Sequence, residues 1–408
     1  MNVPARSTRV LALCLLSAAV TGCSRTPAPP VRATWSPAAA ANYLDARAVW
    51  WVNWPHAMRD QGTFCVSCHT SIPYVIVQPV LRAALSQPVA SQDELALIED
   101  VRRRVRLWKT IQPYYSDEGY DRKGEESRGS EAVLNAFILS SAAAQSGKMD
   151  DDARMAFDNM WSTQQRNGAL AGAWSWLQFD QEPFEANDSP YYGATLAAVA
   201  VNIAPENYRS TSEIQAQLAL LRQFLRKEAE HQSTTNRVML LWASTKWSGL
   251  LSQREQEEII HEALSRQQKD GGWRLASLSW RWRGWTAKSL LNAWIREDGT
   301  PMSGKSDGYA TGLVAYVLQE AGLPRDNPQL QAALSWLRSN QQQDGRWLSE
   351  SVNKRRRKAS GVGLFMSDAA TAYAVLALLE GDQRSQASLP ESSPPYNFSS
   401  ASATTNHE

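Results

Sequence analysis

Two cysteines and a histidine stand close together early in the chain, in the segment Cys65-Val66-Ser67-Cys68-His69. Two thiols at this spacing can form thioethers with the two vinyl groups of one porphyrin, and the adjacent imidazole can then bind its iron as an axial ligand. The motif therefore predicts covalent haem c at Cys65 and Cys68, with His69 as the metal ligand. A zinc site needs about four ligands, and the chain has no second cysteine pair. A redox dithiol would stand at a strand-to-helix turn of an α/β fold, which the surrounding pattern does not predict.

The first 23 residues have the pattern of an export signal, with a short basic region followed by an apolar run that is too short to span a membrane. The run ends in Val20-Thr21-Gly22-Cys23, which resembles a bacterial lipobox. This predicts cleavage before Cys23 and lipidation of that residue; the alternative is an ordinary secretory signal with an incidental cysteine. We expect a membrane-anchored, periplasm-facing lipoprotein, with Ser24 favouring the outer membrane. Because haem c is attached outside the bacterial cytoplasm, this expectation agrees with the haem motif.

Charge gives little indication of a macromolecular partner. The 408 residues carry a formal net charge of +1, so no nucleic-acid partner is expected. The local basic run Lys354-Arg355-Arg356-Arg357-Lys358 is interpreted as a solvated loop, with a site for an anionic partner as the alternative.

Composition divides the chain into five segments. These are a signal at 1–23, a Pro/Ala/Ser-rich tether at 24–41, a haem segment at 42–90, a helical region at 91–382 and a disordered tail at 383–408. The haem segment is too short to enclose a porphyrin alone, so we expect the haem to pack against the helical region.

Two kinds of helix alternate in the helical region. One kind is amphipathic and charged on one face, at 92–111, 151–165, 212–230, 254–268 and 328–341. The other kind is small and apolar, at 130–146, 190–203, 234–247, 308–321 and 368–380. The apolar helices suit an inner layer where helices pack closely, and the charged ones suit an outer layer.

A short pattern, Q-x-x-D-G-x-W, repeats where an outer helix leads to an inner one. Clear copies run from Gln267 to Trp273 and from Gln341 to Trp347, and a weaker copy begins at Gln164. Glycine supplies the left-handed turn after a helix. The tryptophan can cover the glutamine, whose amide can bond the start of a neighbouring helix. The repeat is therefore interpreted as a structural staple.

This repeat resembles the QW repeat of squalene–hopene and oxidosqualene cyclases, and prenyltransferase β subunits carry related repeats. The resemblance covers roughly residues 91–382 and implies an all-α fold, an α/α toroid with an inner and an outer ring of helices around an apolar cavity. Those cyclases protonate their substrate with a D-x-D-D motif. Here the comparable segment, Ser367-Asp368-Ala369-Ala370, has one carboxylate, which puts cyclase or transferase activity in doubt.

Loops that lead into the inner helices are expected to line the cavity mouth. The candidate catalytic acids are Asp188, Asp307 and Asp368, each at the start of an inner helix, where helix capping is the alternative role. The other candidate cavity residues are Glu126, Arg128, Glu182, Glu185, Tyr191, Tyr192 and Tyr309.

Two classes of function are compatible with these features. The first is a redox or electron-transfer enzyme, in which the haem serves an apolar, isoprenoid-like small molecule in the cavity and exchanges electrons with a periplasmic partner. The second is a haem-containing module that binds or senses a ligand without turnover. A third class, a cyclase-like enzyme, has weaker support from the sequence. The second iron ligand is open among His56, Met58, Met149, Met366 and none.

Overall fold

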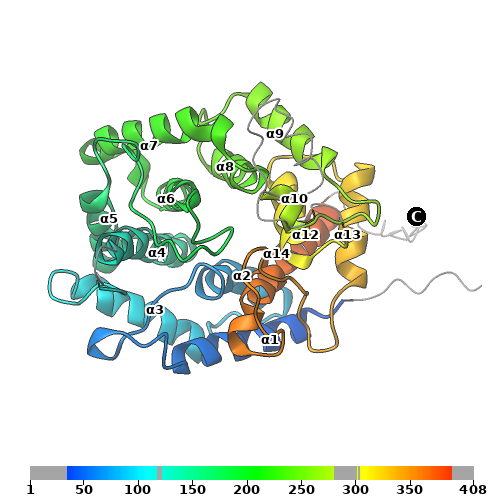
Figure 1. The fold of residues 1–408 in the computed structure, drawn as a ribbon, viewed down its shortest axis with the longest axis horizontal. Coiled ribbons are helices and arrows are strands. Elements are labelled where there is room, and N and C mark those ends of the chain that lie inside the picture. The colour runs from blue at the N-terminus through cyan, green and yellow to red at the C-terminus, as the bar shows by residue number, and fades with distance from the viewer. Residues whose placement is uncertain (1–34, 117–121, 280–300, 302–303, 388–408) are drawn as a thin grey trace, which may run out of the picture. The chain divides into compact units, whose positions relative to one another are not determined.

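Helices form two concentric layers in the unit that begins at Thr34 (Figure 1). The computed structural model describes residues 35–116, 122–279, 301 and 304–387. Its outer helices are α1 (Pro37–Asn53), α3 (Gln92–Arg106), α5 (Asp151–Thr163), α7 (Gln215–Glu228), α9 (Gln253–Ser265) and α13 (Pro328–Ser339). Its inner helices are α2 (Ser71–Ala84), α4 (Lys123–Ser146), α6 (Ser189–Ile203), α8 (Thr234–Lys246), α12 (Gly308–Glu320) and α14 (Phe365–Ala387).

The inner helices form a closed ring, because each packs on the next in the order α2, α4, α6, α8, α12, α14 and back to α2. The short helix α10 (Leu275–Leu278) contacts α8 and α12. Five 3-10 helices connect the described elements: Asp60–Gly62, Tyr208–Ser210, Ser212–Ile214, Ala229–His231 and η5 (Gly361–Leu364). The predicted all-α α/α toroid is confirmed, since the described residues pair in extended form only at two isolated bridges.

Burial separates the two layers as the sequence pattern predicts. In α12 every residue from Gly308 to Gln319 is buried, whereas α9 buries only Ile259 and Ala263. One segment, Gly361–Glu380, is long and apolar enough to cross a membrane, but 83% of its apolar window is buried inside the protein. That segment contains η5 and most of α14, so its apolar character is explained by its place in the inner ring.

The two clear Q-x-x-D-G-x-W junctions have the same geometry. The indoles of Trp273 and Trp347 are fully buried, and each donates to a carbonyl ten residues earlier, on Ala263 at 2.7 Å and on Leu337 at 2.8 Å. The amide of Gln267 bonds the carbonyl of Gln329 at the start of α13 at 2.7 Å. The staple interpretation of these junctions is confirmed in its contacts: each ties one outer helix to the beginning of the next.

The weaker copy uses a later glycine than the sequence spacing indicates. Gln164 bonds the carbonyls of Gly172 at 3.0 Å and of Gln217 in α7 at 3.1 Å, while Gly168 has open space around it. Gly172 has φ +98°, and a Cβ there would lie 2.1 Å from a backbone oxygen of α7. The equivalent glycine is therefore Gly172, two residues before the buried Trp174, and the intervening turn is an insertion.

The segment that carries the cysteine motif is part of the ring. Gln341 in the last junction bonds Ser36, the N-cap of α1: its amide donates to the Ser36 carbonyl at 3.0 Å, and its oxygen accepts from the Ser36 N–H at 2.7 Å. A Cβ on Gly345 would lie 2.1 Å from the Ala39 carbonyl oxygen. Helix α1 thus takes the place of the next outer helix, and α2 fills the inner place between α14 and α4.

This arrangement differs from the division drawn at residues 90 and 91, because the expected haem segment supplies one of the helix pairs of the toroid. Helix α1 also begins at Pro37, within the stretch expected to be a tether. The signal, Cys23 and the last residues of the predicted tail, 388–408, lie outside the described residues.

Candidate functional site

A cavity opens beside the cysteine motif, where α1, α14 and three loops meet. It has a volume of about 200 Å³ and opens to solvent. Its lining residues are Trp51, Trp54, Cys65, Val66, Ser67, His69, Tyr114, Tyr115, Leu177, Phe179, Gln181, Glu185, Arg356 and Phe365. The walls are mostly aromatic, with one carboxylate and one guanidinium. This mixture is typical of small-molecule and cofactor sites.

Hydrogen bonds to backbone groups of residues 65–71 hold the cysteine motif in place. The Ser67 hydroxyl accepts from the N–H groups of Thr70 and Ser71 at 3.1 and 3.0 Å, which caps the start of α2. The indole of Trp51 on α1 donates to the Cys65 carbonyl at 2.7 Å. Ser67, between the two cysteines, therefore has a structural role: it turns the chain into α2 and fixes the position of His69.

Hydrogen bonding determines the form of the His69 imidazole. The Thr70 hydroxyl donates its only proton to Oδ2 of Asp368 at 2.7 Å. It must therefore accept at its 2.9 Å contact with Nδ1 of His69, so Nδ1 carries a proton. Burial is the main cause that lowers the pKa of His69 well below its usual value, and the nearby positive charges of Arg356 and Arg47 lower it further. The ring is thus neutral with an unprotonated Nε2, which is the form that binds a metal.

Asp368 joins the motif to two helices of the ring. Its carboxylate accepts from Arg47 through Nε at 2.7 Å and through Nη2 at 2.9 Å, and from the Tyr43 hydroxyl at 2.8 Å. Burial raises the pKa of Asp368, and these donors together with Thr70 oppose that effect. The carboxylate is 1% exposed and holds α1, the start of α2 and α14 together. It is therefore a positioning group behind His69.

Aromatic rings fix the plane of the imidazole. Phe365 stacks on His69 with 3.8 Å between ring centroids and 19° between planes. Trp51 meets the same ring edge-on, at 5.3 Å and 81°. With one face covered and Nδ1 bonded, the imidazole has little freedom to turn, as is required of a ligand that holds one atom toward a fixed metal.

Both thiols are free and buried. Burial raises the pKa of Cys65 to about 11 and that of Cys68 well above its usual value. Reactive dithiols and zinc thiolates have lowered pKa values, so the surroundings do not favour those alternatives. No group of three or more metal-binding side chains gathers in the described part of the chain. Two thiols next to a neutral, oriented imidazole fit a covalently held haem in the chemistry of their donors.

Glu185 is the one carboxylate on the cavity wall. Its backbone pairs with Gln181 in an isolated bridge, but its side chain makes no hydrogen bond or ion pair with the described residues. Burial raises the pKa of Glu185 from 4.5 to about 7, against the weaker effects of Arg356 and Lys123. Of the candidate cavity residues, this side chain is the one placed at the site to exchange a proton near neutral pH.

The other two candidate acids lie away from this cavity. Asp307 is the N-cap of α12: one carboxylate oxygen accepts from the Ala310 N–H at 3.0 Å and the other from the Leu275 N–H at 2.6 Å. Asp188 precedes α6 and interacts with the Asn236 amide at 3.3 and 3.4 Å. Asp307 therefore has the geometry of a helix cap, whereas the Asp188 side chain does not cap α6 and instead faces Asn236 of α8.

The remaining candidates are also engaged elsewhere or enclosed. Glu126 pairs with Lys123 at 2.7 Å, Arg128 lies over the Trp108 ring, and the Glu182 N–H contacts Asn353. Tyr191 donates to the Leu225 carbonyl at 2.7 Å. Tyr192 and Tyr309 are 1% and 0% exposed, and their hydroxyls have no hydrogen-bond partner among the described residues. Both side chains are enclosed by other aromatic residues, Phe184 beside both and Tyr373 beside Tyr309.

The proposed second iron ligands do not line the cavity. Met58 is 55% exposed, and His56 is exposed with its ring packed beside Trp54 at 5.1 Å. Met366 is buried and borders a neighbouring pocket, and Met149 precedes α5 on another part of the ring. The lining contains the imidazole of His69 and no thioether sulfur.

Several site residues were missed by sequence reasoning. Arg47, Tyr43 and Thr70 carry no motif, and the Arg47–Asp368 pair spans 321 positions in the chain. Phe365 and Trp51 lie in apolar helices that contain other aromatic residues, so nothing in the sequence distinguishes them. Only the identity of Thr70, a hydroxyl directly after His69, could have indicated a partner for Nδ1.

Comparisons with known proteins give a matching family model and a similar solved structure, and they contain no information on the cavity. The family model of the squalene-hopene cyclase C-terminal domain matches residues 303–391, the part that contains α12, α13 and α14. A solved polysaccharide lyase is similar in structure, with a TM-score of 0.46 and 13% identity, over 87% of this chain and 99% of that one. No curated protein matches significantly.

Proposed function

We propose that this chain is an exported haem c lipoprotein that acts as an oxidoreductase, with the haem joined to Cys65 and Cys68 and its iron bound by His69. The observation that carries the proposal is the neutral imidazole. Its Nδ1–H donates a hydrogen bond to the Thr70 hydroxyl and its ring is stacked on Phe365, beside an aromatic cavity whose lining includes Cys65; Cys68 is buried outside that lining. When bound, haem would supply one-electron redox chemistry and could bind a small molecule.

The residues around the cavity have different roles in this proposal. Thr70 and Asp368 hold the imidazole in one tautomer. The tryptophans and Phe365 exclude water from the side of His69 and provide an apolar surface for an apolar ligand. Glu185, with a pKa near 7, can accept or donate a proton at the cavity wall.

His69 is the one imidazole in the cavity lining, which contains no methionine. An oxidoreductase that takes a small molecule into this cavity is therefore better supported than a pure electron carrier. A cyclase-like reaction has less support, because the Asp368 carboxylate is engaged by Arg47, Tyr43 and Thr70 and has no proton free for an alkene.

Spectroscopy of the mature full-length chain tests the cofactor. Produced in cells that mature cytochromes c, the protein should give a c-type pyridine haemochrome, and the variant with both Cys65→Ala and Cys68→Ala should give none. His56→Ala is the matched control, because this exposed imidazole lies outside the cavity lining. A wild-type protein without the c-type band would contradict the proposal.

Carbon monoxide tests whether the iron can bind a small molecule. The reduced protein should bind it with a shift of the absorption spectrum, and a spectrum that does not respond would show two strong protein ligands. Redox titration then separates an enzyme from a ligand-sensing module: turnover of an apolar substrate by the reduced or oxidised haem supports the enzyme, and ligand binding without turnover supports the sensor.

The anchor and the location are part of the same proposal. We expect Cys23→Ala to release the protein from membranes or to leave it unprocessed. Membrane fractionation and the mass of the mature N-terminus measure this. A variant that remains correctly cleaved and membrane-bound would place the anchor elsewhere.

A further inference from the structure

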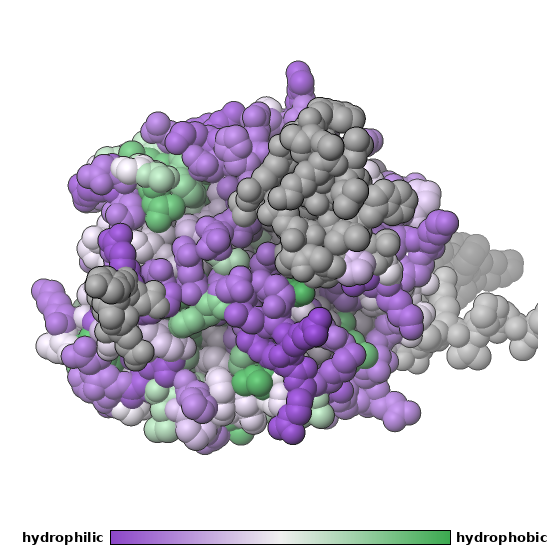
Figure 2. Space-filling model, in the orientation of Figure 1, coloured by the Kyte–Doolittle hydropathy of each residue, from purple (hydrophilic) through white to green (hydrophobic). Residues whose placement is uncertain are grey.

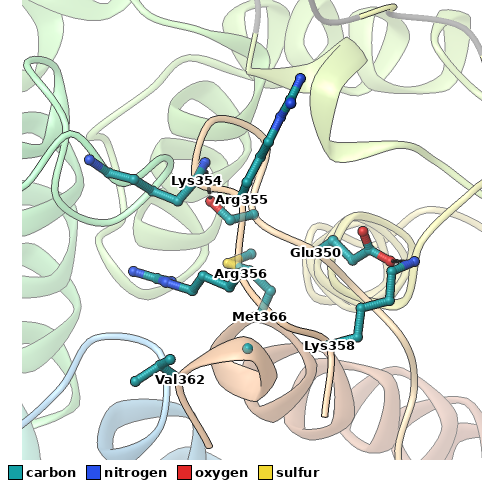
Figure 3. Close-up of a pocket in the computed structure, with 9 residues that line it drawn as sticks. Glu350, Lys354, Arg355, Arg356, Lys358, Val362 and Met366 are labelled. Atoms are coloured by element: carbon teal, nitrogen blue, oxygen red, sulfur yellow. Dashed lines mark hydrogen bonds and ion pairs between the residues drawn. The ribbon is translucent and has the colours of Figure 1, made fainter. Parts of the chain in front are cut away.

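The basic run at 354–358 borders a pocket and is not simply a solvated loop. The pocket, of about 160 Å³, is lined by Glu350, Ser351, Lys354, Arg355, Arg356, Lys358, Val362, Gly363 and Met366. In Figure 3, Lys354, Arg355 and Arg356 extend from one part of the loop, while Glu350 and Lys358 lie together on its other side. Figure 2 shows a dense hydrophilic group on this face of the ring, over the region where α14 and α1 meet.

Hydrogen bonds hold the loop that carries these cations in place. The Lys354 N–H donates to the Ser351 hydroxyl at 3.0 Å, and the Gly363 N–H donates to the Ser360 hydroxyl at 3.1 Å. Between these last two residues, the Gly361 carbonyl accepts a hydrogen bond from Arg47 of α1 at 2.8 Å. The loop is thereby tied to α1, and the pocket is shaped by fixed backbone.

Positive charge in this pocket is only partly neutralised. Of the lining cations, Lys358 pairs with Glu350 at 2.5 Å, Lys354 is 3.6 Å from Asp180, and Arg356 bonds the neutral amide of Gln181 at 2.5 Å. Arg355 makes no ion pair or hydrogen bond within the described part of the chain. Burial lowers the pKa of Arg356, and the nearby Glu185 carboxylate opposes this effect; the guanidinium also lies over the Phe365 ring.

The floor of the pocket is apolar. Val362 and the buried Met366, at the start of α14, lie beneath the cations. Arg356 is shared, because it also lines the aromatic cavity beside the cysteine motif. A molecule that fills this pocket would therefore present an anionic group to the loop and an apolar part to the floor, next to that cavity.

We propose that this pocket binds a diffusible small organic anion, a carboxylate with a short apolar chain, through Arg356, whose side chain extends away from that of Arg355 (Figure 3). The site is independent of the haem proposal, since no residue that binds the anion takes part in haem attachment. Guanidinium groups bind carboxylates through charge-assisted hydrogen bonds, which are the strong ones.

Calorimetry on the mature full-length chain tests this, with acetate and hexanoate as probes at low ionic strength. Hexanoate should bind saturably at one site and more tightly than acetate, because of Val362 and Met366. Arg356→Gln should weaken hexanoate binding about tenfold. Arg357→Gln is the matched control: it removes the same charge from an exposed residue of the same loop that does not line the pocket, and binding should stay within about twofold. Melting curves confirm that both variants are folded.

Three results would overturn the proposal. Absence of saturable binding would show that the pocket holds no such anion. An equal loss in Arg357→Gln would show that loop charge alone attracts it. Binding that occurs only in the haem-free variant with both Cys65→Ala and Cys68→Ala would show that the propionates of the haem occupy the pocket. Binding that persists in that variant and in the mature chain supports the proposal, whatever the outcome of the haem test.

Discussion

The starts of α12 and α14 look alike in sequence and differ in what their carboxylates do. Both follow a buried tryptophan junction. In the first, the Trp273 N–H donates to Thr311 at 2.9 Å and the Leu275 N–H to Asp307 at 2.6 Å. In the second, the Trp347 N–H donates to Thr371 at 3.1 Å and the Ser349 N–H to Ser367 at 3.3 Å.

The residue of α14 that corresponds to Asp307 is therefore Ser367, and Asp368 is one position farther along the chain. One position turns a side chain by roughly 100° about a helix axis. Ser367 satisfies the junction, so Asp368 is free to face α1 and α2, where it binds Arg47 and Thr70. The Ser367 hydroxyl makes the bond to the junction that Asp307 makes in α12, so the neighbouring Asp368 carboxylate can bond Arg47 and Thr70 instead.

The largest expected difference separates these two acids. Asp368→Asn leaves the buried Arg47 guanidinium without its counter-charge, and we expect unfolding free energy to fall by about 3–5 kcal/mol. Asp307→Asn can keep the cap to Ala310 but places an amide NH2 group opposite the Leu275 N–H, so its cost should be smaller, about 1–3 kcal/mol. Urea unfolding of both variants measures the difference. Equal losses would show that Asp368 is also a helix cap.

A carboxylate without partners should respond to pH in the opposite way from a paired one. Glu185 has a folded-state pKa of about 7 against an ordinary 4.5. Its neutral form contributes stability that is present below pH 4.5 and is lost as the pH rises toward 7. Glu185→Gln keeps the neutral form, so the variant should gain about 2 kcal/mol relative to wild type between pH 4 and pH 8. Unfolding at both pH values measures this. A stability difference that does not change with pH would mean that Glu185 titrates normally.

The junctions themselves should behave alike, which sharpens the contrast between the acids. Trp273→Phe and Trp347→Phe each keep the aromatic packing and remove one indole hydrogen bond to a buried carbonyl. We expect each to lose about 1–3 kcal/mol of unfolding free energy. Calorimetric melting of the two variants should give similar shifts. A much larger effect at Trp347 would show that its junction also supports the site.

The smallest expected effect is local to α1. Gln341→Ala removes both bonds to Ser36 and should cost about 1 kcal/mol. Hydrogen exchange should rise in α1 and stay unchanged in α13. Gln267→Ala should show the reverse, because that glutamine holds the start of α13. Increased exchange in both helices for either variant would contradict the assignment of one junction to one neighbour.

The repeating part of the ring could be predicted from the sequence because its signals are local. Helix period, small apolar inner faces and the spacing from glutamine to tryptophan all lie within short windows. The weaker copy was assigned to the wrong glycine, since an insertion between Gln164 and Gly172 has no signature apart from the backbone contact it makes.

The site could be predicted only where its chemistry lies in one segment. The cysteine motif names three residues, whereas Arg47, Asp368 and Phe365 reach it from helices far away in the chain. Grouping Asp307 with Asp368 placed the second in a capping role, because a one-residue difference in register is not visible without the bonds to Ser367 and Thr371.

The bond between Thr70 and Asp368 joins positions 298 residues apart, which gives the molecule an order of assembly. A chain is synthesised from its N-terminus and its parts fold as they become available. The cysteine motif therefore emerges long before α14, the helix that closes the ring and completes the surroundings of His69. Until then the thiols and the imidazole stand on an open pair of helices, which is where the haem that we propose would have to be attached. Closure of the ring is thus the step that buries the two thiols and the imidazole.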